Sequence, residues 1–438
     1  MRILRPALCV LAAVLVLAGV YSLVASRIAD SDSPAPSRVP PGYAVLPDAG
    51  GRPALVACTA NSARRAALRN VAAINHIVTA LHRESRVFIL TNDRDAFSVL
   101  SNPSPERVRF LGLPSGLAFT IWPQDPFVVL ESGDPARPPV YLVPRQFTRA
   151  DDRRLADLLA AETGAACIPS EFVFEGGNIV ADRDFVFIGV NTILHNAELT
   201  GDSAAEVTRR FAAELGRKAM VIGPAPQPVG HIDLVLAPLG GRRVALADPG
   251  WGARLVRDLV ARDPEAATAF EQECIDGFFG RKGIKGLLDK DGRPIDPPDI
   301  LGHTRTAAAH CAGLAADFDA LATDLEDIGY EVLRIPFLGP APEDEVRPAP
   351  DAPDGEVPLP GPRFPTLTYN NVILSGRDTV FLARYGLGPL DEAAAGAWRA
   401  AGYEVRPVEA MTTSAMYGGS LRCCVKVLER SSASPRNE

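Results

Sequence analysis

A cysteine near the end of the chain is the first candidate for catalysis. Cys423 lies in the segment GGSLRCC (Gly418 to Cys424), behind two glycines and directly after the cation Arg422. A thiolate is a strong nucleophile, and nearby positive charge favours the ionised form. Because free cysteines are common in protein cores, the segment alone is equally compatible with packing. If residues 421–428 form a strand, alternation places Cys423 in the site and Cys424 in the core.

A second candidate is Asp125 in the segment WPQDP (residues 122–126). The apolar strand expected at 127–130 follows directly, so this carboxylate can enter a pocket, with Trp122 as an aromatic wall for a cation. A turn framed by prolines and capped by the aspartate is the simpler alternative.

A third candidate is Glu175 in FEGGN (residues 174–178), where it follows the strand expected at 171–174. Gly176 and Gly177 allow close backbone approach to whatever Glu175 binds, although hairpin glycines serve the same purpose structurally. Burying a carboxylate is costly unless a cation meets it, and this favours a binding role.

The fourth segment, GHIDLVLAPL (residues 230–239), supplies an acid–base pair. In a strand over 232–236, His231 and Asp233 would share one face while Ile232 packs on the other. Histidine transfers protons near neutrality, and a nearby carboxylate raises its pKa. An edge strand with a polar face is the alternative.

Apolar patterning predicts an α/β body in which strands alternate with amphipathic helices about five times. One helix, capped by Asn61 or Ser62, buries Val71, Ile74, Val78 and Leu81; another opens with a Thr148–Asp151 capping box and closes at Gly164. The remaining elements are a helix at 203–217 and strands at 86–90, 185–190, 330–337 and 379–383.

The beginning of the chain differs in composition from the rest. After Arg2 and Arg5 the sequence carries no charge from Ala7 to Ala25, which predicts a signal peptide or membrane anchor over residues 1–25. The amino-terminal arginines place the body across the membrane, so we expect an extracytoplasmic protein, secreted or anchored, whose contact with the membrane is limited to this segment.

The organisation predicted for the remainder is a linker and one domain. Residues 26–43 are rich in Pro, Ser and Asp and indicate a linker, and residues 44–438 then form a single catalytic domain. Insertions are expected near 275–303, rich in Gly, Lys and Asp, and near 339–365, rich in Pro and acidic residues, where the second is a solvated spacer or a site for a basic peptide.

Composition excludes several classes of protein. The seven cysteines are odd in number and scattered, with no CxxC pair suited to zinc or redox chemistry, so neither a disulfide scaffold nor a metal site is expected. The net charge of −8 argues against nucleic-acid binding and favours cationic ligands. The surroundings of a papain-like nucleophile are also missing.

Taken together, the four segments resemble the guanidine-modifying (pentein) superfamily, above all its agmatine deiminases and bacterial-type peptidylarginine deiminases. The family's Trp-x-Arg-Asp, Glu-Gly-Gly-Asn, Gly-His-x-Asp and Gly-Gly-Gly-x-His-Cys elements match, in order, 122–125, 175–178, 230–233 and 418–423. A Tyr-x-Asn-hydrophobic stretch also matches TYNNV, from Thr368. The resemblance covers roughly residues 44–428.

The resemblance implies a fold, a set of residues and a reaction. The fold would be a five-bladed, pseudo-symmetric α/β propeller. Cys423, His231, Asp233, Glu175 and Asp125 would be catalytic, and the substrate would contact Trp122, Asp125, Glu175, Asp233, Gly176 and Asn178. The expected reaction is hydrolysis of a guanidino group, in a small molecule or a peptide, to a ureido product and ammonia through a Cys423 thiouronium, without metal or cofactor.

Departures from the family's pattern leave the substrate and two other functions open. Gln124 stands where the family has arginine, Pro126 replaces its Thr-Gly-Pro continuation, and Arg422 replaces histidine. An amidinotransferase would pass the amidino group from the same thiouronium to an amine. A non-catalytic guanidinium-binding protein at the membrane surface would keep the fold without turnover.

Overall fold

The computed structural model describes residues 38–60, 65–92, 94, 106–114, 116–117, 119–279, 287–289, 302–342, 345–348, 361–362 and 364–431. The expected leader at 1–25, most of the linker at 26–43 and the cap at Asn61 or Ser62 lie outside these residues, as do 280–286 and 290–301 of the first insertion and most of 343–363 in the second. No helix within the described ranges is both long and apolar enough to cross a membrane.

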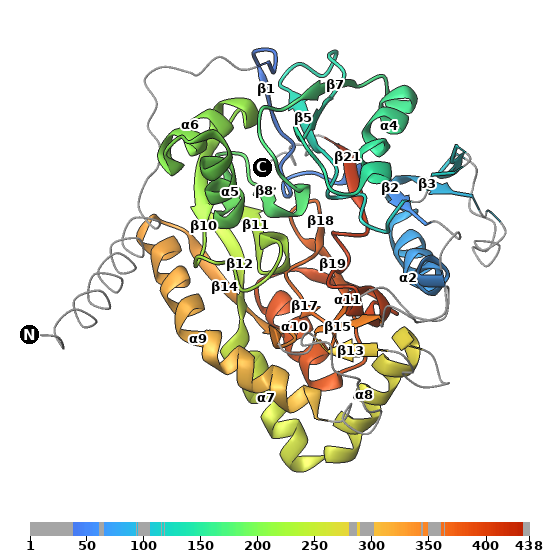
Figure 1. The fold of residues 1–438 in the computed structure, drawn as a ribbon, viewed down its shortest axis with the longest axis vertical. Helices are drawn as coiled ribbons and strands as arrows, with labels where there is room; N and C mark the ends of the chain where they lie inside the picture. Colours follow the sequence, from blue (N-terminus) through green and yellow to red (C-terminus); the bar gives the residue numbers. More distant parts are fainter. Residues whose placement is uncertain are drawn as a thin grey trace, which may run out of the picture.

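The described chain is a mixed α/β fold with strands in the interior and helices at the periphery (Figure 1). Ten α-helices are described: α2 (Arg65–Leu81), α3 (Ala150–Arg153), α4 (Leu155–Thr163), α5 (Val190–Thr200), α6 (Ala204–Leu215), α7 (Pro249–Arg262), α8 (Pro264–Phe279), α9 (His303–Asp327), α10 (Gly388–Ala400) and α11 (Thr412–Met416). Two short 3-10 helices complete them, η2 (Gly176–Asn178) and η3 (Ile232–Leu234).

Five sheets hold the main body of strands, and a smaller one lies apart from them. In spatial order the five are β21 (Lys426–Arg430), β2 (Pro53–Thr59), β3 (Arg86–Thr91), β4 (Val108–Gly112); β1 (Tyr43–Val45), β5 (Val128–Ser132), β6 (Val140–Val143), β7 (Ala166–Pro169); β8 (Ile179–Ala181), β9 (Phe185–Gly189), β10 (Lys218–Ile222); β11 (Leu236–Gly240), β12 (Arg243–Asp248), β14 (Glu331–Leu338), β17 (Leu367–Thr368); and β18 (Ile373–Ser375), β19 (Thr379–Ala383), β20 (Glu404–Val408). The smaller sheet contains β13 (Leu287–Asp289), β15 (Glu345–Pro348) and β16 (Gly361–Pro362).

The five larger sheets share one pairing pattern. Each contains an antiparallel pair, β21–β2, β5–β6, β8–β9, β11–β12 or β18–β19. In each, the second strand of that pair continues through one or more helices into a parallel neighbour, which is β3, β7, β10, β14 or β20. This repetition accounts for the fivefold rhythm of strands and helices in the sequence.

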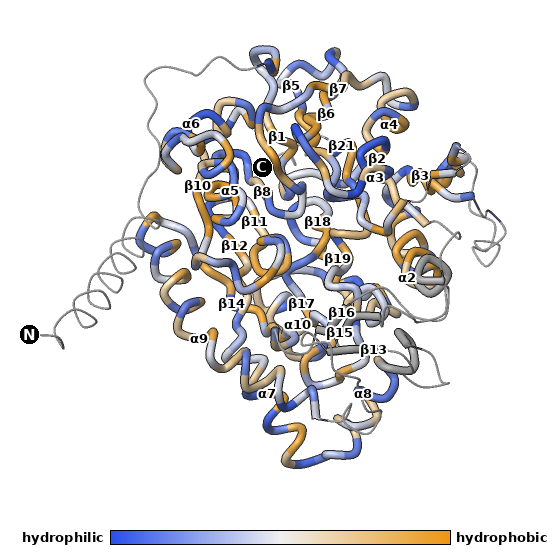
Figure 2. Tube along the Cα trace, viewed as in Figure 1, coloured by the Kyte–Doolittle hydropathy of each residue, from blue (hydrophilic) through white to orange (hydrophobic). Residues whose placement is uncertain are grey.

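Burial of apolar side chains explains how the helices pack. The helix α6 begins at Ser203, whose side chain accepts a hydrogen bond from the Glu206 amide, and ends at Gly216, which adopts a positive φ. Along α9, hydrophobic and hydrophilic turns alternate (Figure 2), as expected for a helix with one buried face.

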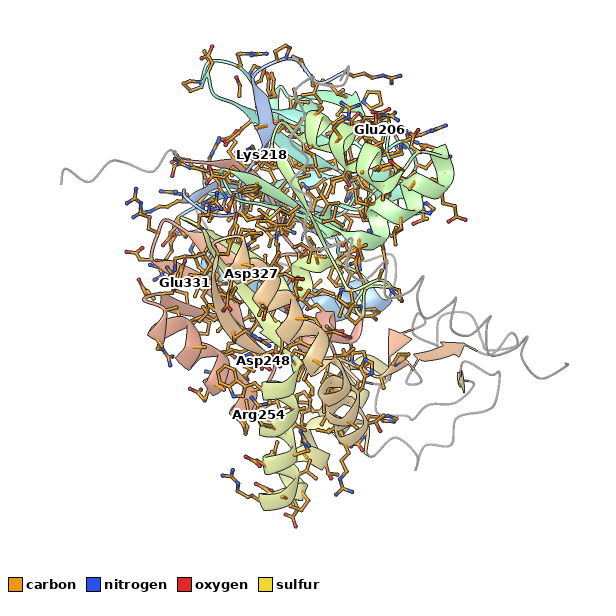
Figure 3. The ribbon with its side chains drawn as sticks, turned by 90° about the vertical axis from the view of Figure 1, so that its left-hand side faces the viewer. Glu206, Lys218, Asp248, Arg254, Asp327 and Glu331 are labelled. Carbon is orange, nitrogen blue, oxygen red and sulfur yellow. The ribbon has the colours of Figure 1, made fainter. Side chains whose placement is uncertain are left out.

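The longest crossover carries three helices on the outside of the molecule. Asp248 caps α7 by accepting from the Trp251 amide, and Arg254 follows within the same helix. After α8 and α9 the chain turns from Asp327 into β14, which starts at Glu331 (Figure 3). The described residues of this crossover contribute no side chain to the candidate site described below.

Several predicted elements are confirmed, namely α6 and strands β3, β9, β14 and β19 near their expected bounds. Others are wrong. Residues 171–174 form no strand, residues 232–234 form the helix η3 before β11, and residues 421–424 form a turn before β21. Thr148 caps no helix, since Arg149 precedes α3 without a side-chain cap, although Gly164 does end α4.

Two of these errors share a physical cause. Residues 232–234 and 421–424 have strand-like composition, but backbone hydrogen bonds within a turn replace those of a ladder. The Cys424 amide, for example, donates to the carbonyls of Ser420 and Leu421.

Candidate active site

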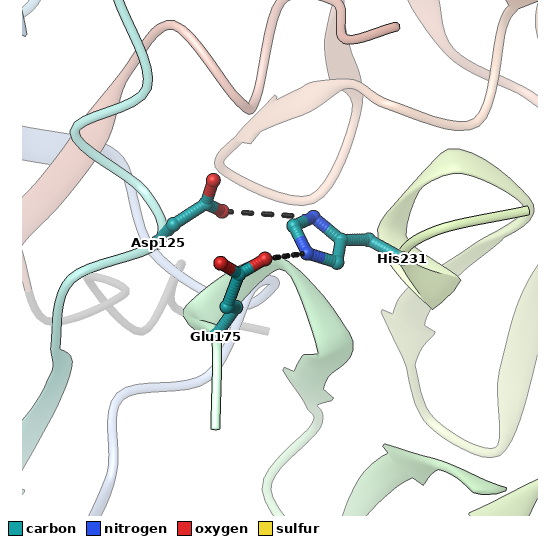
Figure 4. A group of neighbouring side chains, drawn as sticks. All are labelled: Asp125, Glu175 and His231. Atoms are coloured by element: carbon teal, nitrogen blue, oxygen red, sulfur yellow. Dashed lines mark hydrogen bonds and ion pairs between the residues drawn. The ribbon is translucent and has the colours of Figure 1, made fainter. Parts of the chain in front are cut away.

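Three of the predicted site residues point toward one another (Figure 4). The His231 imidazole lies between two carboxylates: Nε2 is 2.6 Å from Glu175 Oε2 and Nδ1 is 3.6 Å from Asp125 Oδ1. Asp125 is almost fully buried and its Oδ1 has no hydrogen-bond partner among the described residues. The cluster therefore contains one acceptor oxygen that is free to bind a donor from a ligand.

Glycines let these segments approach so closely. The Gly176 amide donates to the Asp125 carbonyl over 2.8 Å. A Cβ atom on Gly177 would collide with the His231 ring and lie 3.0 Å from Asp125 Oδ1. Only glycine fits there, which explains the pair in FEGGN.

Asn178 connects the glutamate segment to the histidine segment. Its Oδ1 accepts from the Ile232 amide at 3.0 Å, and its Nδ2 donates to Thr192 Oγ1 at 2.7 Å. The Gln227 side chain bonds the same amide twice: its Oε1 accepts from Asn178 Nδ2, and its Nε2 donates to Asn178 Oδ1. These bonds show a positioning role for Asn178 behind His231, while its predicted contact with substrate stays a prediction.

Cys423 lies in the turn before β21, next to Asp233. Its Sγ is 3.7 Å from Asp233 Oδ2 and 3.9 Å from Oδ1. Asp125 and Asp233 each act electrostatically on both the thiol and His231. Cys424 is completely buried in the core beside it.

Asn371 is a residue of this site that was not among the sequence candidates. Its Nδ2 donates to Cys423 Sγ at 3.3 Å and to the Asp233 carbonyl at 3.1 Å, and its Oδ1 accepts from the Cys423 amide at 3.1 Å. Its place in the Tyr-x-Asn-hydrophobic stretch was the signal that could have identified it.

The five segments of the site come from five different sheets. Asp125, Glu175, His231, Asn371 and Cys423 lie just before β5, β8, β11, β18 and β21 respectively. Each of these strands opens the antiparallel pair of its own sheet. The repeated topology therefore brings residues distant in sequence to one location.

Arg422 was expected to favour the thiolate form of Cys423, but its guanidinium is bonded to other groups. Its guanidinium donates from Nη1 to Asp233 at 2.8 Å and from Nε to Asp48 at 2.9 Å, and Nη2 donates to the Ile179 carbonyl. Burial, followed by the charges of Asp233 and Asp125, holds the pKa of the Cys423 thiol well above its usual value. The expectation of a thiolate favoured by this cation is therefore wrong for the ligand-free protein, because the thiol is buried and Arg422 is paired with Asp233 and Asp48.

Arg149 is a second site residue that the sequence did not indicate. Its Nη2 donates to Asp125 Oδ2 at 2.7 Å, its Nε donates to Asp152 at 2.8 Å, and its Nη1 lies 3.5 Å from Glu175 Oε1. Its guanidinium also lies over the Phe147 ring, 4.8 Å from the centroid. The carboxylates proposed to bind a substrate guanidinium thus already hold one from the protein itself.

Charge within the cluster sets its protonation. Burial alone would lower the pKa of His231, but Asp125, the Glu175 hydrogen bond and Asp233 outweigh it and raise that pKa to about 9. Burial likewise opposes the ionisation of Glu175, yet the hydrogen bond from His231 and the charges of His231 and Arg149 hold its pKa below the ordinary value. The raised pKa of His231 and the lowered pKa of Glu175 both indicate an imidazolium paired with a carboxylate at neutral pH.

The side chains of the candidate site differ in their exposure to solvent. The side chains of Glu175 and Arg149 are 33% and 29% exposed, while Asp233 is fully buried. Trp122 packs against Gly419, where any Cβ would collide with the indole ring.

Asp125, Glu175 and His231 also have the geometry of a metal-ligand set, with one donor atom from each within 4.8 Å of the others. A metal ion there would have to displace the proton held by His231 and the guanidinium of Arg149.

Comparisons with solved structures identify the fold. Similar structures include a proposed arginine deiminase from Porphyromonas gingivalis (16% identity, TM-score 0.56, covering 88% of this chain and 97% of that one) and an agmatine deiminase of C. jejuni (12%, 0.56, 88% and 95%). An agmatine deiminase of Enterococcus faecalis matches similarly (13%, 0.54, 89% and 96%). No protein-family model and no curated protein matches the sequence.

The chain accordingly has the fold of the pentein superfamily, to which these guanidine-modifying proteins belong. This confirms, at the level of the fold, the resemblance found in the sequence. At identities this low the likeness says nothing further about activity, which depends on the site itself.

Proposed function

We propose that this protein hydrolyses the guanidino group of an arginine derivative, a peptidyl arginine or an agmatine-like compound to a ureido product and ammonia. The observation that carries the proposal is the cluster of Cys423, His231 and three carboxylates, two of which already bind a guanidinium, that of Arg149. The neighbours named as deiminases support the same reaction class.

We also propose that the five larger sheets are arranged as a five-bladed propeller. Its blades would be the five sheets with the shared pairing pattern, and β21–β2 would close the ring by joining the end of the chain to its beginning. The site would then lie where the five blades converge.

The reaction begins with deprotonation of the Cys423 thiol. In the ligand-free site burial, followed by the charges of Asp233 and Asp125, keeps the thiol protonated. A bound guanidinium pairs with these carboxylates and adds positive charge beside Sγ, so the thiol releases its proton to water and becomes a thiolate as substrate binds. Asn371 orients Sγ through its 3.3 Å hydrogen bond.

Attack and the first bond cleavage follow. Sγ forms a bond to the guanidino carbon, and the C=N π electrons move to nitrogen to give a tetrahedral adduct. His231, protonated at neutral pH, donates its proton to the departing nitrogen as the C–N bond breaks and ammonia leaves. A thiouronium remains on Cys423.

Water completes the cycle. The now neutral His231 takes a proton from a water molecule, whose oxygen bonds to the thiouronium carbon. The C–S bond then breaks and its electrons return to sulfur. The hydroxyl proton of the product passes to the Cys423 thiolate, which restores the thiol, and the neutral ureido product leaves. Asp233, buried and bonded to Arg422, stays in place as a carboxylate partner of the substrate.

A substrate panel tests the reaction. Full-length protein in mild detergent is incubated with arginine, agmatine and arginyl peptides, and ureido product and ammonia are measured. Turnover of at least one compound is expected, with Cys423→Ala inactive and the matched core variant Cys424→Ala active but less stable. Silence on every compound at high protein concentration, or equal activity of the two variants, contradicts the proposal.

Guanidinium binding without turnover is the second candidate. It is favoured by the pairing of Arg149 and Arg422 with the site's acids and by the raised pKa of Cys423. Alkylation by 2-chloroacetamidine separates the two, since a hydrolase must present a reactive Cys423 to an amidine whereas a binder need not. An amidinotransferase would instead require a second amine for product formation.

We also propose that the body acts outside the cytoplasm, because the uncharged segment from Ala7 to Ala25 follows Arg2 and Arg5. That location favours peptides or extracellular arginine compounds as substrates. Fractionation of cells expressing the full chain tests it, and protease protection of the body in intact cells would contradict it.

A further inference from the structure

A pocket beside Arg422 lies outside the candidate active site, and Cys423 is not among its lining residues. Its volume is about 40 Å³, room for a few water molecules or one small ion. Four charged side chains line it, Asp48, Arg422, Lys426 and Arg430, together with Gln124 and apolar residues. Cys423 and His231 do not line it, although Arg422 connects it to Asp233 of the candidate active site.

Positive charge in this pocket exceeds negative charge. Asp48 is the single carboxylate of its lining, and it is paired with Arg422 at 2.9 Å. Within the described residues neither Lys426 nor Arg430 forms an ion pair. Uncompensated buried cations are costly, so two such groups beside one cavity call for a counter-charge.

The hydrogen bonds of the two cations leave donors available. Lys426 is 2% exposed; its Nζ donates to the carbonyls of Gln124 (3.0 Å) and Phe127 and lies 4.4 Å from the centroid of the Phe127 ring. When protonated, it carries a third N–H group that no hydrogen bond within the described residues uses. Arg430 donates from Nη1 to the carbonyls of Gly51 and Leu374, while its buried Nε has no partner in the described part of the chain.

The charge of Arg422 acts on both cations. Burial and then Arg422 lower the pKa of Lys426 to about 7, while burial lowers that of Arg430 to about 10, where Asp48 opposes the shift and Arg422 adds to it. An anion between them would stabilise the charged forms of both.

We propose that the Arg422–Lys426–Arg430 pocket binds one small monovalent inorganic anion, such as chloride, through Lys426 Nζ and Arg430 Nε. The volume admits a halide or nitrate and excludes organic anions such as gluconate. Because Arg422 also holds Asp233, this anion would sit one side chain away from the candidate active site.

Titration calorimetry on the full chain tests the proposal with chloride, bromide and nitrate against gluconate at constant ionic strength. Saturable binding of the small anions is expected. Lys426→Met and Arg430→Met should each weaken it at least about tenfold, since each removes a charged donor. The exposed Arg153→Met is the matched control and should bind as wild type does. Heat identical for gluconate and chloride, or binding unchanged in both pocket variants, overturns the proposal.

The dependence on pH gives a second readout. Since Lys426 must be protonated to donate charge, binding should be tighter at about pH 6 than at about pH 8.5. The other charged groups facing Lys426 are Arg422, Asp125, Asp48 and Asp233, so Lys426→Met must remove the pH dependence if Lys426 is its source. A dependence that survives in this variant overturns that assignment.

A crystal soaked in bromide covers the case in which the variants do not fold. An anomalous peak in contact with Lys426 Nζ and Arg430 Nε is expected in the wild-type protein. Absence of a peak in the pocket, with bromide bound elsewhere on the surface, overturns the proposal.

Discussion

At the scale of residues, the candidate site is a set of acids whose partners are arginines of the same chain. Arg149 binds Asp125 and approaches Glu175, and Arg422 binds Asp233. A cationic substrate therefore meets carboxylates that already have partners. The more exposed of the two arginines, Arg149, is the one that an incoming guanidinium can replace.

Removing Arg149 tests this competition. In a Cys423→Ala background, which prevents turnover, Arg149→Ala should bind agmatine about tenfold more tightly, or by about 1.4 kcal/mol, because Asp125 and Glu175 lose their internal guanidinium. Titration calorimetry measures the affinity. Arg153→Ala, an exposed change on the adjacent helix, is the control. Weaker binding by Arg149→Ala would mean instead that Arg149 holds part of the ligand.

The pKa of His231 gives the stability of the fold a predictable pH dependence. Its folded-state pKa of about 9 exceeds the ordinary value of 6.5, so protonated His231 stabilises the fold fully below pH 6.5, and this contribution is lost as pH rises through about 9. The shift corresponds to about 3 kcal/mol.

Urea unfolding of wild type and His231→Gln across this pH range measures the contribution. The difference in free energy of unfolding should be largest below pH 6.5 and shrink toward zero above about pH 9. The exposed His195→Gln should change little at any pH. A wild-type advantage that grows with pH would contradict an imidazolium paired with Glu175 and Asp125.

At the scale of elements, turns before strands carry the site. The sequence predicted the chemistry of Asp125, Glu175, His231 and Cys423 from short motifs, and β9 and β19 from apolar runs. It could not predict that 232–234 and 421–424 leave the sheet, because strand-forming composition does not show where a turn's own hydrogen bonds replace the ladder.

Arg149 and Asn371 show the other limit of prediction from sequence. Both reach the site through tertiary packing: Arg149 precedes a short helix whose Asp152 binds it, and Asn371 bonds Cys423 across two sheets. An arginine before a helix and an asparagine in a loop are ordinary features of any sequence. Only the placement of five turns at one location gives them a role.

The substitution Gly177→Ala, which adds a Cβ atom, tests whether the close approach of Gly177 to His231 is needed for activity. Gly177→Ala should lower activity strongly, because its Cβ would displace the His231 ring from Glu175 and Asp125. Gly396→Ala is the matched control: it lies inside α10 with open space around it and should stabilise the fold by about 1 kcal/mol without changing kcat/KM. Wild-type activity in Gly177→Ala would show that the placement of His231 is not needed.

At the scale of the whole molecule, the two ends of the described chain hold each other in place. The last strand, β21, pairs antiparallel with β2, with Val427 opposite Val56. Cys423 lies in the turn before β21 and Lys426 is its first residue, so this sheet positions both the candidate nucleophile and the anion pocket. Loss of the pairing between β2 and β21 would therefore affect both sites together with the stability of the fold.

A substitution in β21 tests this coupling. Leu428 is 1% exposed and packs in one core cluster with Leu55 and Ala57 of β2, so Leu428→Ala should lower the free energy of unfolding by about 2–5 kcal/mol through the cavity it leaves. Glu429→Ala, which removes only the exposed ion pair with Arg86, should cost less than about 1 kcal/mol. Urea unfolding followed by circular dichroism and by Cys423 alkylation should give one coincident transition in each variant, because the sheet that joins the chain ends also holds the thiol. If the thiol becomes reactive well before the circular dichroism signal changes, then β21 detaches independently and the chain ends are not a cooperative part of the fold.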